Sequence, residues 1–532
     1  MDAVVIGAGP NGLVAANLLA DAGWDVEVLE AQERPGGAVK SAEVTAPGYV
    51  SDLYSSFYPL ALGSPVLGGL ELERYGLSWR HAPKVLAHPL LDGRTAVLSR
   101  DLDRTVASVA EFSPGDGEAW RDLVRHWERL QPSLVESLMT PFPPLRAGAG
   151  LMRRLGVREG LRFARFATLS VRRYAEESFD GEGGPLLLAG NAMHTDLAPE
   201  APGSAVFGWL LAMLAQTVGY PVPEGGAGRL TDALVRRLEA HGGRIRCDAP
   251  VRAVVVRDGR AVGVRLDDGS FVGAERAVLA DVSAPALYHR LLGPELLPER
   301  LRSDLARFDW DDATVKVDWA LSGPVPWKNA EVAGAGTVHL GGSLEQISRF
   351  AHELALGYLT PEPFLLFGQM TTADPSRSPT GTESAWAYTH VPARPRGDAA
   401  GELSGAWGDP ALHAGFLDRI ERRVERFAPG FRDLIVGRHV AFPPDLESQD
   451  ANLVHGALNG GTSELYQQLI FRPTPGLSRP ETHIAGLYLA SASAHPGGGV
   501  HGACGANAAR AALRARTTGR LALAAQRALL GT

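Results

Sequence analysis

The chain has 532 residues, 45% of them hydrophobic and 21% charged, with a net charge of −8. This length exceeds what one hydrophobic core usually serves, so we expect two intertwined or sequential domains. The acidic balance gives no reason to expect nucleic-acid binding, and Cys247 and Cys504, without a CxxC pair, exclude a redox-active disulfide of the reductase kind. With no leader-like segment before the first strand, we expect a cytoplasmic protein.

A short apolar run, Asp2 to Ile6, leads directly into a glycine-rich turn and then into a helix. The turn is Gly7-Ala8-Gly9-Pro10-Asn11-Gly12, and a second strand, Trp24 to Leu29, ends at Glu30. This order of strand, glycine turn, helix, strand and acid is the context in which GxGxxG indicates a bound dinucleotide. The sequence therefore predicts an ADP moiety at the N-terminus of this helix, where free N–H groups favour phosphate.

Each residue of this motif has a physical role in the prediction. Gly7 permits the tight turn, Gly9 lets the backbone approach a pyrophosphate, and Gly12 lets the helix pack closely on the strand. Glu30 can accept hydrogen bonds from ribose hydroxyls, and its charge disfavours the 2′-phosphate of NADP. The stretch from Glu30 to Gly37 spells E-x-x-x-R-x-G-G and is similar to the second flavin motif of glutathione-reductase-like flavoproteins. We assign to cofactor binding in this region Gly7, Gly9, Pro10, Asn11, Gly12, Glu30, Ala31, Arg34, Gly36 and Gly37.

The next segments alternate aromatic, hairpin and helical patterns. Aromatic residues cluster just after the glycine loops, where they could wall a pocket: Tyr49, Tyr54, Phe57 and Tyr58. Residues 85–98 predict a hairpin turning at Asp92-Gly93, and residues 114–139 predict a helix with a core stripe of tryptophan and leucine. Ser204 to Tyr220 is apolar but one residue short of about 18, so a buried or interfacial helix is expected rather than a membrane span.

Residues 146–173 carry eight arginines against one acid, Glu159, with leucine and phenylalanine interleaved. Two interpretations are open: a solvated helix face, or peripheral docking on an anionic bilayer. The arginines are Arg146, Arg153, Arg154, Arg158, Arg162, Arg165, Arg172 and Arg173.

Further along, the glycine-rich stretch GGAG at 225–228 precedes a predicted helix over 231–241. Three β runs follow at 244–256, 261–266 and 271–279, with turns at Asp258-Gly259 and Asp268-Gly269. Residues 277–281 are expected to return to the main sheet. Residues 313–321 alternate as a half-exposed strand should, and residues 364–370 and 384–390 are two more strands of a second, antiparallel sheet.

The second informative stretch is C-terminal, where the strand Gly486 to Ser491 runs into five glycines between Gly497 and Gly505 and then into a small-residue helix. Such glycines suit a backbone that lies flat against a ring system with its N–H groups aimed at it, and we assign Gly498, Gly499 and Val500 to this role. His495 and His501 flank the cluster and are the candidate catalytic residues; the alternative is that each is a structural histidine bonded to backbone.

The N-terminal motif, ExxxRxGG, the GGAGRL stretch and the C-terminal glycine element follow one another in the order found in the phytoene desaturase and carotenoid isomerase-like flavoproteins, which the chain resembles. The stretch NGGTSELYQQLIFRP at 459–473, just before the last element, strengthens the resemblance, which is greatest to the branch called pyridine nucleotide-disulfide oxidoreductase domain-containing protein 2. The resemblance covers nearly the full length and implies FAD, redox chemistry on an apolar substrate, and adenine contact through the backbone of Val251. It implies an α/β fold: a Rossmann-like FAD-binding domain of the glutathione-reductase and amine-oxidase type, with a discontinuous α+β substrate domain containing an antiparallel sheet.

The expected domain boundaries place residues 1–80, 221–290 and 455–532 in the FAD-binding domain. Residues 81–220 and 291–454 form the substrate-binding domain, with a membrane-facing helical region near 140–220. We found no cluster of metal ligands in the sequence and expect no metal site.

We expect an FAD-dependent oxidoreductase that dehydrogenates a polyene, isoprenoid or other lipid-like substrate by hydride transfer to flavin N5, with oxygen or a quinone as electron acceptor. A flavin amine oxidase, a redox-neutral polyene isomerase and a non-catalytic prenyl-binding protein of the GDP-dissociation-inhibitor type remain alternatives. The sequence leaves the substrate identity and the oligomeric state open.

Overall fold

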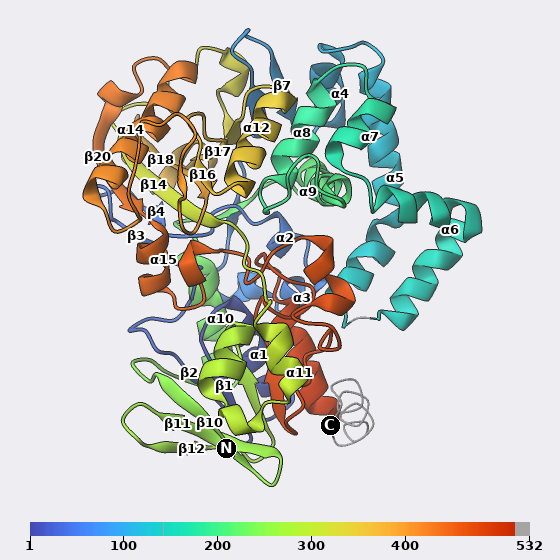
Figure 1. Cartoon of the computed structure of the whole chain (residues 1–532), viewed down its shortest axis with the longest axis vertical. Helices are drawn as coiled ribbons and strands as arrows, with labels where there is room; N and C mark the ends of the chain where they lie inside the picture. Colours follow the sequence, from blue (N-terminus) through green and yellow to red (C-terminus); the bar gives the residue numbers. More distant parts are fainter. Residues whose placement is uncertain (142, 516–532) are drawn as a thin grey trace.

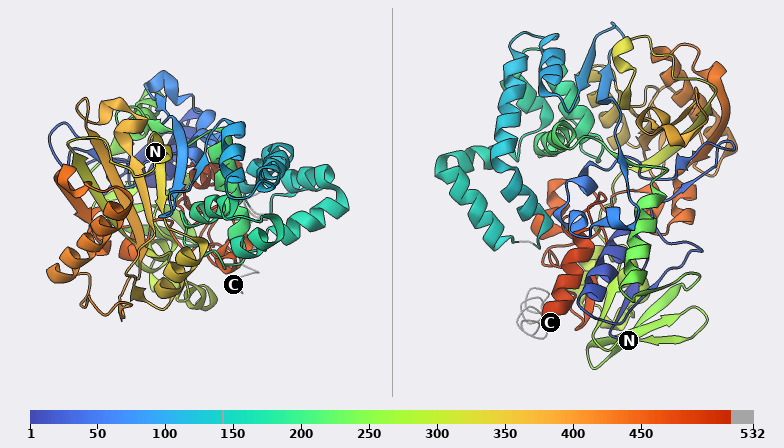
Figure 2. Two further views of the ribbon diagram at one scale, coloured as in Figure 1. Left: turned by 90° about the horizontal axis from the view of Figure 1, so that it is seen from above. Right: turned by 180° about the vertical axis from the view of Figure 1, so that it is seen from behind.

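A computed structural model describes residues 1–141 and 143–515 of the chain (Figure 1). Two sheets organise the molecule, one in the part that holds the N-terminus and the other at the opposite end of the long axis. A helical arm projects to one side and is seen clearly from behind in Figure 2. No helix in the described ranges is long and apolar enough to cross a bilayer.

The first sheet is parallel, with the order β21-β13-β1-β2-β9. It is covered on one face by helices α1 (Pro10–Asp21) and α10 (Gly228–Ala240), and on the other by a three-stranded antiparallel meander. The strands of the parallel sheet are β1 (Ala3–Ile6), β2 (Val26–Leu29), β9 (Arg244–Arg246), β13 (Ala277–Ala280) and β21 (Leu487–Leu489), and those of the meander are β10 (Val251–Arg257), β11 (Arg260–Leu266) and β12 (Phe271–Gly273).

The predicted β run at 244–256 is wrong as a single strand. Its first part, β9, joins the parallel sheet beside β2, and only β10 enters the meander. The chain turns between them at Asp248, which has a φ of +51°, and Pro250 follows. The N–H groups of Asp248 and Ala249 donate to Gln32 and Glu30, so this turn crosses the carboxyl end of β2.

The second sheet has seven strands in the order β20-β14-β18-β17-β15-β6-β7, all paired antiparallel except β15 with β6. Helix α14 (Pro410–Phe427) covers one face, while α8 (Gly183–Ala192) and α9 (Ser204–Thr217) lie on the other. The strands are β6 (Lys84–Pro89), β7 (Thr95–Leu98), β14 (Ala313–Leu321), β15 (Ala335–Leu340), β17 (Leu365–Gln369), β18 (Glu383–Val391) and β20 (Ile435–Ala441).

Strand β14 differs from its prediction in burial. Its alternating pattern predicts one exposed face, but all nine residues are buried because helices cover the sheet on both sides. The polar side chains of the pattern, including Lys316 and Asp318, therefore face the interior rather than solvent. A buried polar face needs internal partners, and this points to a site.

The helical arm consists of α4 (Leu102–Ala110), α5 (Asp116–Met139), α6 (Leu145–Phe166) and α7 (Val171–Ser178). Trp120 and Trp127 of α5 are buried in its core, as the helical stripe predicts. Gly156, with a φ of +68°, breaks α6 into a projecting helical bend (Figures 1 and 2). The other helices are α2 (Pro59–Leu62), α3 (Pro65–Gly68), α11 (Glu299–Leu305), α12 (Leu344–Ala355), α13 (Met370–Ala373) and α15 (Pro443–Gln449).

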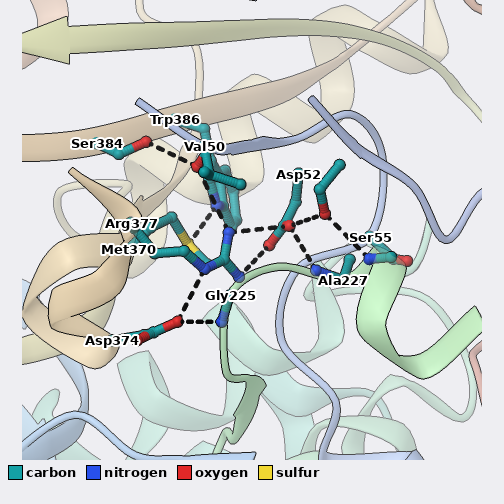
Figure 3. A network of polar contacts seen from close by, with 12 residues as sticks. Val50, Asp52, Ser55, Gly225, Ala227, Met370, Asp374, Arg377, Ser384 and Trp386 are labelled. Carbon is teal, nitrogen blue, oxygen red and sulfur yellow. Dashed lines mark hydrogen bonds and ion pairs between the residues drawn. The ribbon is translucent and has the colours of Figure 1, made fainter. Parts of the chain in front are cut away.

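A buried ion cluster joins segments that lie far apart in the sequence (Figure 3). The guanidinium of Arg377 lies between the carboxylates of Asp52 and Asp374, all three side chains being at most 1% exposed. These carboxylates also accept the N–H groups of Ala227 and Gly225, at 2.7 Å each. The GGAGRL segment, the loop after the ExxxRxGG motif and the turn before β18 are thereby fixed to one another.

Candidate active site

One large cavity, of about 1330 Å³, lies between the two sheets and is lined by residues from both. Pockets for single small ligands usually span about 300–1,000 Å³. The volume therefore suits a dinucleotide together with a substrate. The lining changes character along the cavity, from glycine-rich at the parallel sheet, through polar at the second sheet, to apolar between the helices.

The glycine-rich end is built by the N-terminal motif. Gly7 adopts a φ of +90° and packs its backbone against Asp281, where an added Cβ would lie 2.8 Å from the carbonyl oxygen. The carboxylate of Glu30 accepts the N–H groups of Ala8 at 2.7 Å and Gln32 at 2.9 Å, which fixes it at the cavity wall. The predicted residues that line this end are Gly7, Gly9, Pro10, Asn11, Glu30, Ala31, Gly37 and Val251.

Three predicted cofactor residues do not line the cavity. Gly12 and Gly36 shape the loops from behind: a Cβ on Gly12 would lie 2.2 Å from the Gly7 carbonyl oxygen, and Gly36 donates to Ala8 at 2.8 Å. The side chain of Arg34 is 79% exposed and contacts Glu33 instead. The side chain of the arginine in the ExxxRxGG pattern therefore does not reach the cavity.

Asp281 is a site residue that the sequence reasoning missed. Its Oδ2 accepts the N–H of Gly12 at 2.8 Å, at the N-terminus of α1, and burial raises its pKa to about 7. It follows β13, whose carboxyl end lies beside that of β1. Ligands of open parallel sheets bind at this edge, so the strand-ending acid was the available signal.

The C-terminal glycine cluster forms another wall, with Gly498, Gly499 and Val500 all lining the cavity. His501 lines it as well, but its Nδ1 accepts the N–H of Ala503 at 3.0 Å and its carbonyl accepts the hydroxyl of Ser64 at 2.7 Å. These bonds give His501 a positioning role at the start of the C-terminal helix. Burial lowers the pKa of both His495 and His501 to about 4, so both rings are neutral at neutral pH.

Arg472 supports this wall from behind. Its guanidinium is buried and donates to the carbonyls of Asn459, Gly461, Thr462 and Ala492. Arg472 thereby ties the 459–462 loop to the end of β21. Cys504 is also buried and does not line the cavity; its thiol lies 3.5 Å from the carbonyl of Ala494.

The second sheet supplies a polar wall that the sequence did not reveal. Lys316 and Tyr388 are paired across β14 and β18 and both line the cavity. The ammonium group of Lys316 binds Asp318 and lies 5.8 Å from the ring centre of Trp386, which stacks on Tyr388. The signal that was available is that Lys316 is one of only four lysines and stands within a predicted strand.

Helix α8 and the segment after it complete this polar wall. His194 lines the cavity and shares a hydrogen bond of 2.9 Å with His339 of β15, between their Nε2 atoms. Tyr220 also lines it and donates its hydroxyl to Asn191. Asp196, two residues after His194, accepts the hydroxyl of Thr462 and the N–H of Ser463.

The aromatic prediction is confirmed for Tyr54, Phe57 and Tyr58, which line the cavity. Tyr49 lies outside it, buried, with its hydroxyl donating to Leu321 at 3.2 Å. The far end of the cavity is apolar and reaches the surface at residues 469–471, which are 40–44% exposed. Its apolar lining comes from α5, α6, α9 and residues 465–471, namely Leu134, Leu138, Met139, Phe163, Val206, Phe207, Leu210, Leu211, Leu465, Leu469, Ile470 and Phe471.

A parallel sheet with GxGxxG at its carboxyl edge, joined to a second sheet across one cavity, defines a dinucleotide-dependent oxidoreductase. The chain belongs to the family of flavin containing amine oxidoreductases, whose match covers residues 11–513. FAD is therefore its cofactor, and the glycine walls and fixed Glu30 carboxylate fit that group. This membership removes the non-catalytic prenyl-binding alternative.

The relatives agree with this assignment. The chain is 28% identical to mouse pyridine nucleotide-disulfide oxidoreductase domain-containing protein 2, over 96% of this chain and 93% of the relative. It is also 28% identical to the lycopene-forming phytoene desaturase of Pseudescherichia vulneris, over 96% and 98%. A solved oxidoreductase from Methanosarcina mazei shares the fold, with a TM-score of 0.63 at 18% identity, over 97% and 100%. The predicted fold class and the resemblance to phytoene desaturase-like flavoproteins are confirmed.

Proposed function

We propose that this FAD-dependent oxidoreductase dehydrogenates a C–H bond of a largely apolar, isoprenoid or lipid-like substrate. The observation that carries the proposal is the apolar end of the cavity, which is continuous with the cofactor walls and is lined by leucine, phenylalanine, valine, isoleucine and methionine. Burying such a surface against an apolar chain is favourable by roughly 25 cal/mol per Å². Phytoene desaturases among the relatives support the same substrate class.

When bound, FAD supplies the hydride acceptor, at its N5. Dehydrogenation to a C=C bond removes one hydride and one proton from the substrate, so the protein must provide a group that receives the proton. His495 lines the cavity, and burial keeps its imidazole neutral above about pH 4, so it can accept that proton. The electrons leave to oxygen or a quinone, which completes the balance.

An amine substrate is the second candidate, since the family description names amine oxidoreductases. The aromatic group that would surround an amine is present as Phe57, Trp386 and Tyr388. However, the ammonium of Lys316 already lies over the Trp386 ring, so a cation occupies the ring face that would bind a protonated amine. The apolar dehydrogenation is therefore favoured over the amine reaction.

The test is anaerobic mixing of the purified yellow protein with isoprenoid alkenes, fatty-acyl lipids and amines, followed by flavin absorbance. Bleaching by an apolar compound supports the proposal, and bleaching by amines alone favours the amine oxidase. Turnover that needs no electron acceptor identifies a redox-neutral isomerase.

We also propose that the cavity mouth faces an anionic membrane, from which the substrate enters. Phe163 of α6 and residues 469–471 line the same cavity end, and the bend of α6 exposes Val157 at 79% and Leu161 at 69%. Arg153, Arg154 and Arg158 lie exposed beside them. Apolar and basic residues on one projecting helix suit interfacial binding.

A further inference from the structure

The polar wall of the cavity carries atoms that have no hydrogen-bond partner in the described chain. The hydroxyl of Tyr388 makes no hydrogen bond there, and neither does Nδ1 of His194, although its Nε2 bonds to His339. Both residues line the cavity and are otherwise enclosed by protein. Because both side chains line the cavity and the protein does not bond these two atoms, they are available for a ligand.

The surroundings hold these two groups in fixed positions. Tyr388 stacks on Trp386 at a 5.9 Å centroid distance and lies 5.7 Å from the ring of His390. His194 lies edge-on to Tyr220 at 5.9 Å, and Tyr220 in turn interacts electrostatically with Tyr388. The two available atoms therefore belong to one packed cluster, formed by β18 and the turn that follows α8. A site held in this way is suited to specific recognition.

The wall also carries little net charge. Lys316 is paired with Asp318 inside the sheet, and burial lowers the pKa of His194 to about 3, so its ring is neutral. A neutral phenol and a neutral imidazole match an uncharged ligand oxygen, which accepts hydrogen bonds and, in a hydroxyl, also donates one. A hydrocarbon would leave both of them unsatisfied, and a carboxylate would lack a free cation.

From this geometry we propose that the substrate is amphipathic: an apolar skeleton bearing a neutral hydroxyl or carbonyl oxygen that binds Tyr388 and His194. The inference rests on the proposed function, because it places the oxygen in the same cavity as the reacting chain. The skeleton then lies toward the apolar end, between α5, α9 and residues 469–471. This divides the substrate space into an oxygen subsite and a chain subsite.

The test uses FAD-loaded protein under anaerobic conditions and five compounds with one skeleton: farnesene, farnesol, farnesal, farnesoic acid and farnesylamine. Binding is measured by the perturbation of the flavin spectrum, and reduction by its bleaching. We expect farnesol or farnesal to bind at least about tenfold more tightly than farnesene, because a site built for an oxygen rejects the analogue that lacks it. Equal binding of farnesene, or tightest binding of farnesoic acid, would overturn the inference.

Tyr388→Phe removes only the hydroxyl and keeps the ring that stacks on Trp386. We expect it to reduce the preference for the oxygenated compounds by about 3- to 10-fold, while the affinity for farnesene stays the same. The matched control is Tyr288→Phe, since Tyr288 is buried but does not line the cavity. An unchanged preference in Tyr388→Phe, or an equal loss in Tyr288→Phe, would overturn the assignment.

The proposed function fails in a different way. Bleaching by farnesylamine alone, or by none of the five compounds, counts against dehydrogenation whatever the order of binding. Bleaching by farnesene with no preference for farnesol keeps the dehydrogenation and removes only the oxygen subsite.

Discussion

Arg377 and Asp52, 325 residues apart, form a bidentate ion pair with both side chains 0% exposed. The Nη1–Oδ1 and Nη2–Oδ2 distances are 3.0 and 2.9 Å. Asp374 is a second carboxylate on the same guanidinium and accepts its Nε–H at 3.1 Å. The pair fixes the loop after the ExxxRxGG motif to the turn before β18.

Arg377→Met should lower the free energy of unfolding by about 3–5 kcal/mol, because it leaves two buried carboxylates without their cation. Urea unfolding followed by circular dichroism measures this loss. The matched control is Arg74→Met, whose exposed pair with Glu71 should contribute less than about 0.5 kcal/mol. A loss no larger than that of the control would show that the buried pair does not hold the two parts together.

Asp281 predicts a pH dependence of stability. Its pKa is raised by burial from 3.8 to about 7, so the unfolded chain ionises first as the pH rises. Between these values the folded state holds a proton that the unfolded state has lost, so stability falls as pH rises, by at most about 1.4 kcal/mol per pH unit. Asp281→Asn should remove this part of the slope between about pH 4 and 7. An identical slope in wild type and variant would assign the titration elsewhere.

The nucleotide end could be predicted from sequence because its signals are local. Gly7, Gly9 and Glu30 stand at fixed spacing on one strand-turn-helix-strand unit, and backbone geometry alone brings them together. Arg34 does not line the cavity, because a motif letter does not fix a side-chain direction and the exposed loop lets it pair with Glu33.

The polar wall could not be predicted because it is assembled by sheet register. Lys316 and Tyr388 lie 72 positions apart and meet only because β14 and β18 pair antiparallel. The same reason explains why part of the arginine segment is neutralised although its sequence contains only one acid. Glu177 and Glu200 lie outside residues 146–173 but pair with Arg165 and Arg172. Long-range pairing of this kind leaves no periodic signal in a single sequence.

FAD should be bound without a covalent link. The thiol of Cys504 is buried away from the cavity and burial raises its pKa to about 12, so no thiolate faces the cofactor. Acid precipitation should release the yellow colour to the supernatant, and colour in the pellet would contradict this. Gly9→Val should abolish FAD retention, since even a Cβ there would lie 2.7 Å from the carboxylate of Asp281.

His495→Ala should slow anaerobic flavin reduction by roughly 10²–10⁴-fold if His495 receives the proton, while FAD stays bound. Because burial lowers the pKa of His495 to about 4, its imidazole is protonated only below that value. The wild-type reduction rate should therefore be flat above about pH 5 and fall at lower pH. The control is His501→Ala, which should weaken FAD retention instead, since His501 holds the helix start at Ala503. Unchanged reduction in His495→Ala would remove the residue from the reaction.

The exposed bend of α6 predicts membrane binding through a part of the arginine segment only. Arg162, Arg165, Arg172 and Arg173 each lie within 3.2 Å of a glutamate oxygen. Arg153, Arg154 and Arg158 have no such ion pair in the described chain, and the side chain of Arg146 lies outside the described residues. The free charge is therefore concentrated at the bend, beside the exposed Val157 and Leu161.

Replacing Arg153, Arg154 and Arg158 by glutamine should weaken co-sedimentation with anionic vesicles at low salt, by up to about 1 kcal/mol per arginine. Val157→Asp with Leu161→Asp should weaken it further, because the apolar contact with the acyl region is lost. The matched control is Arg173→Gln, which removes an arginine whose charge Glu177 already neutralises at 2.9 Å, and it should change binding little. Equal binding of the wild type to anionic and neutral vesicles, or an equal loss in Arg173→Gln, would return the whole segment to an ordinary solvated helix face.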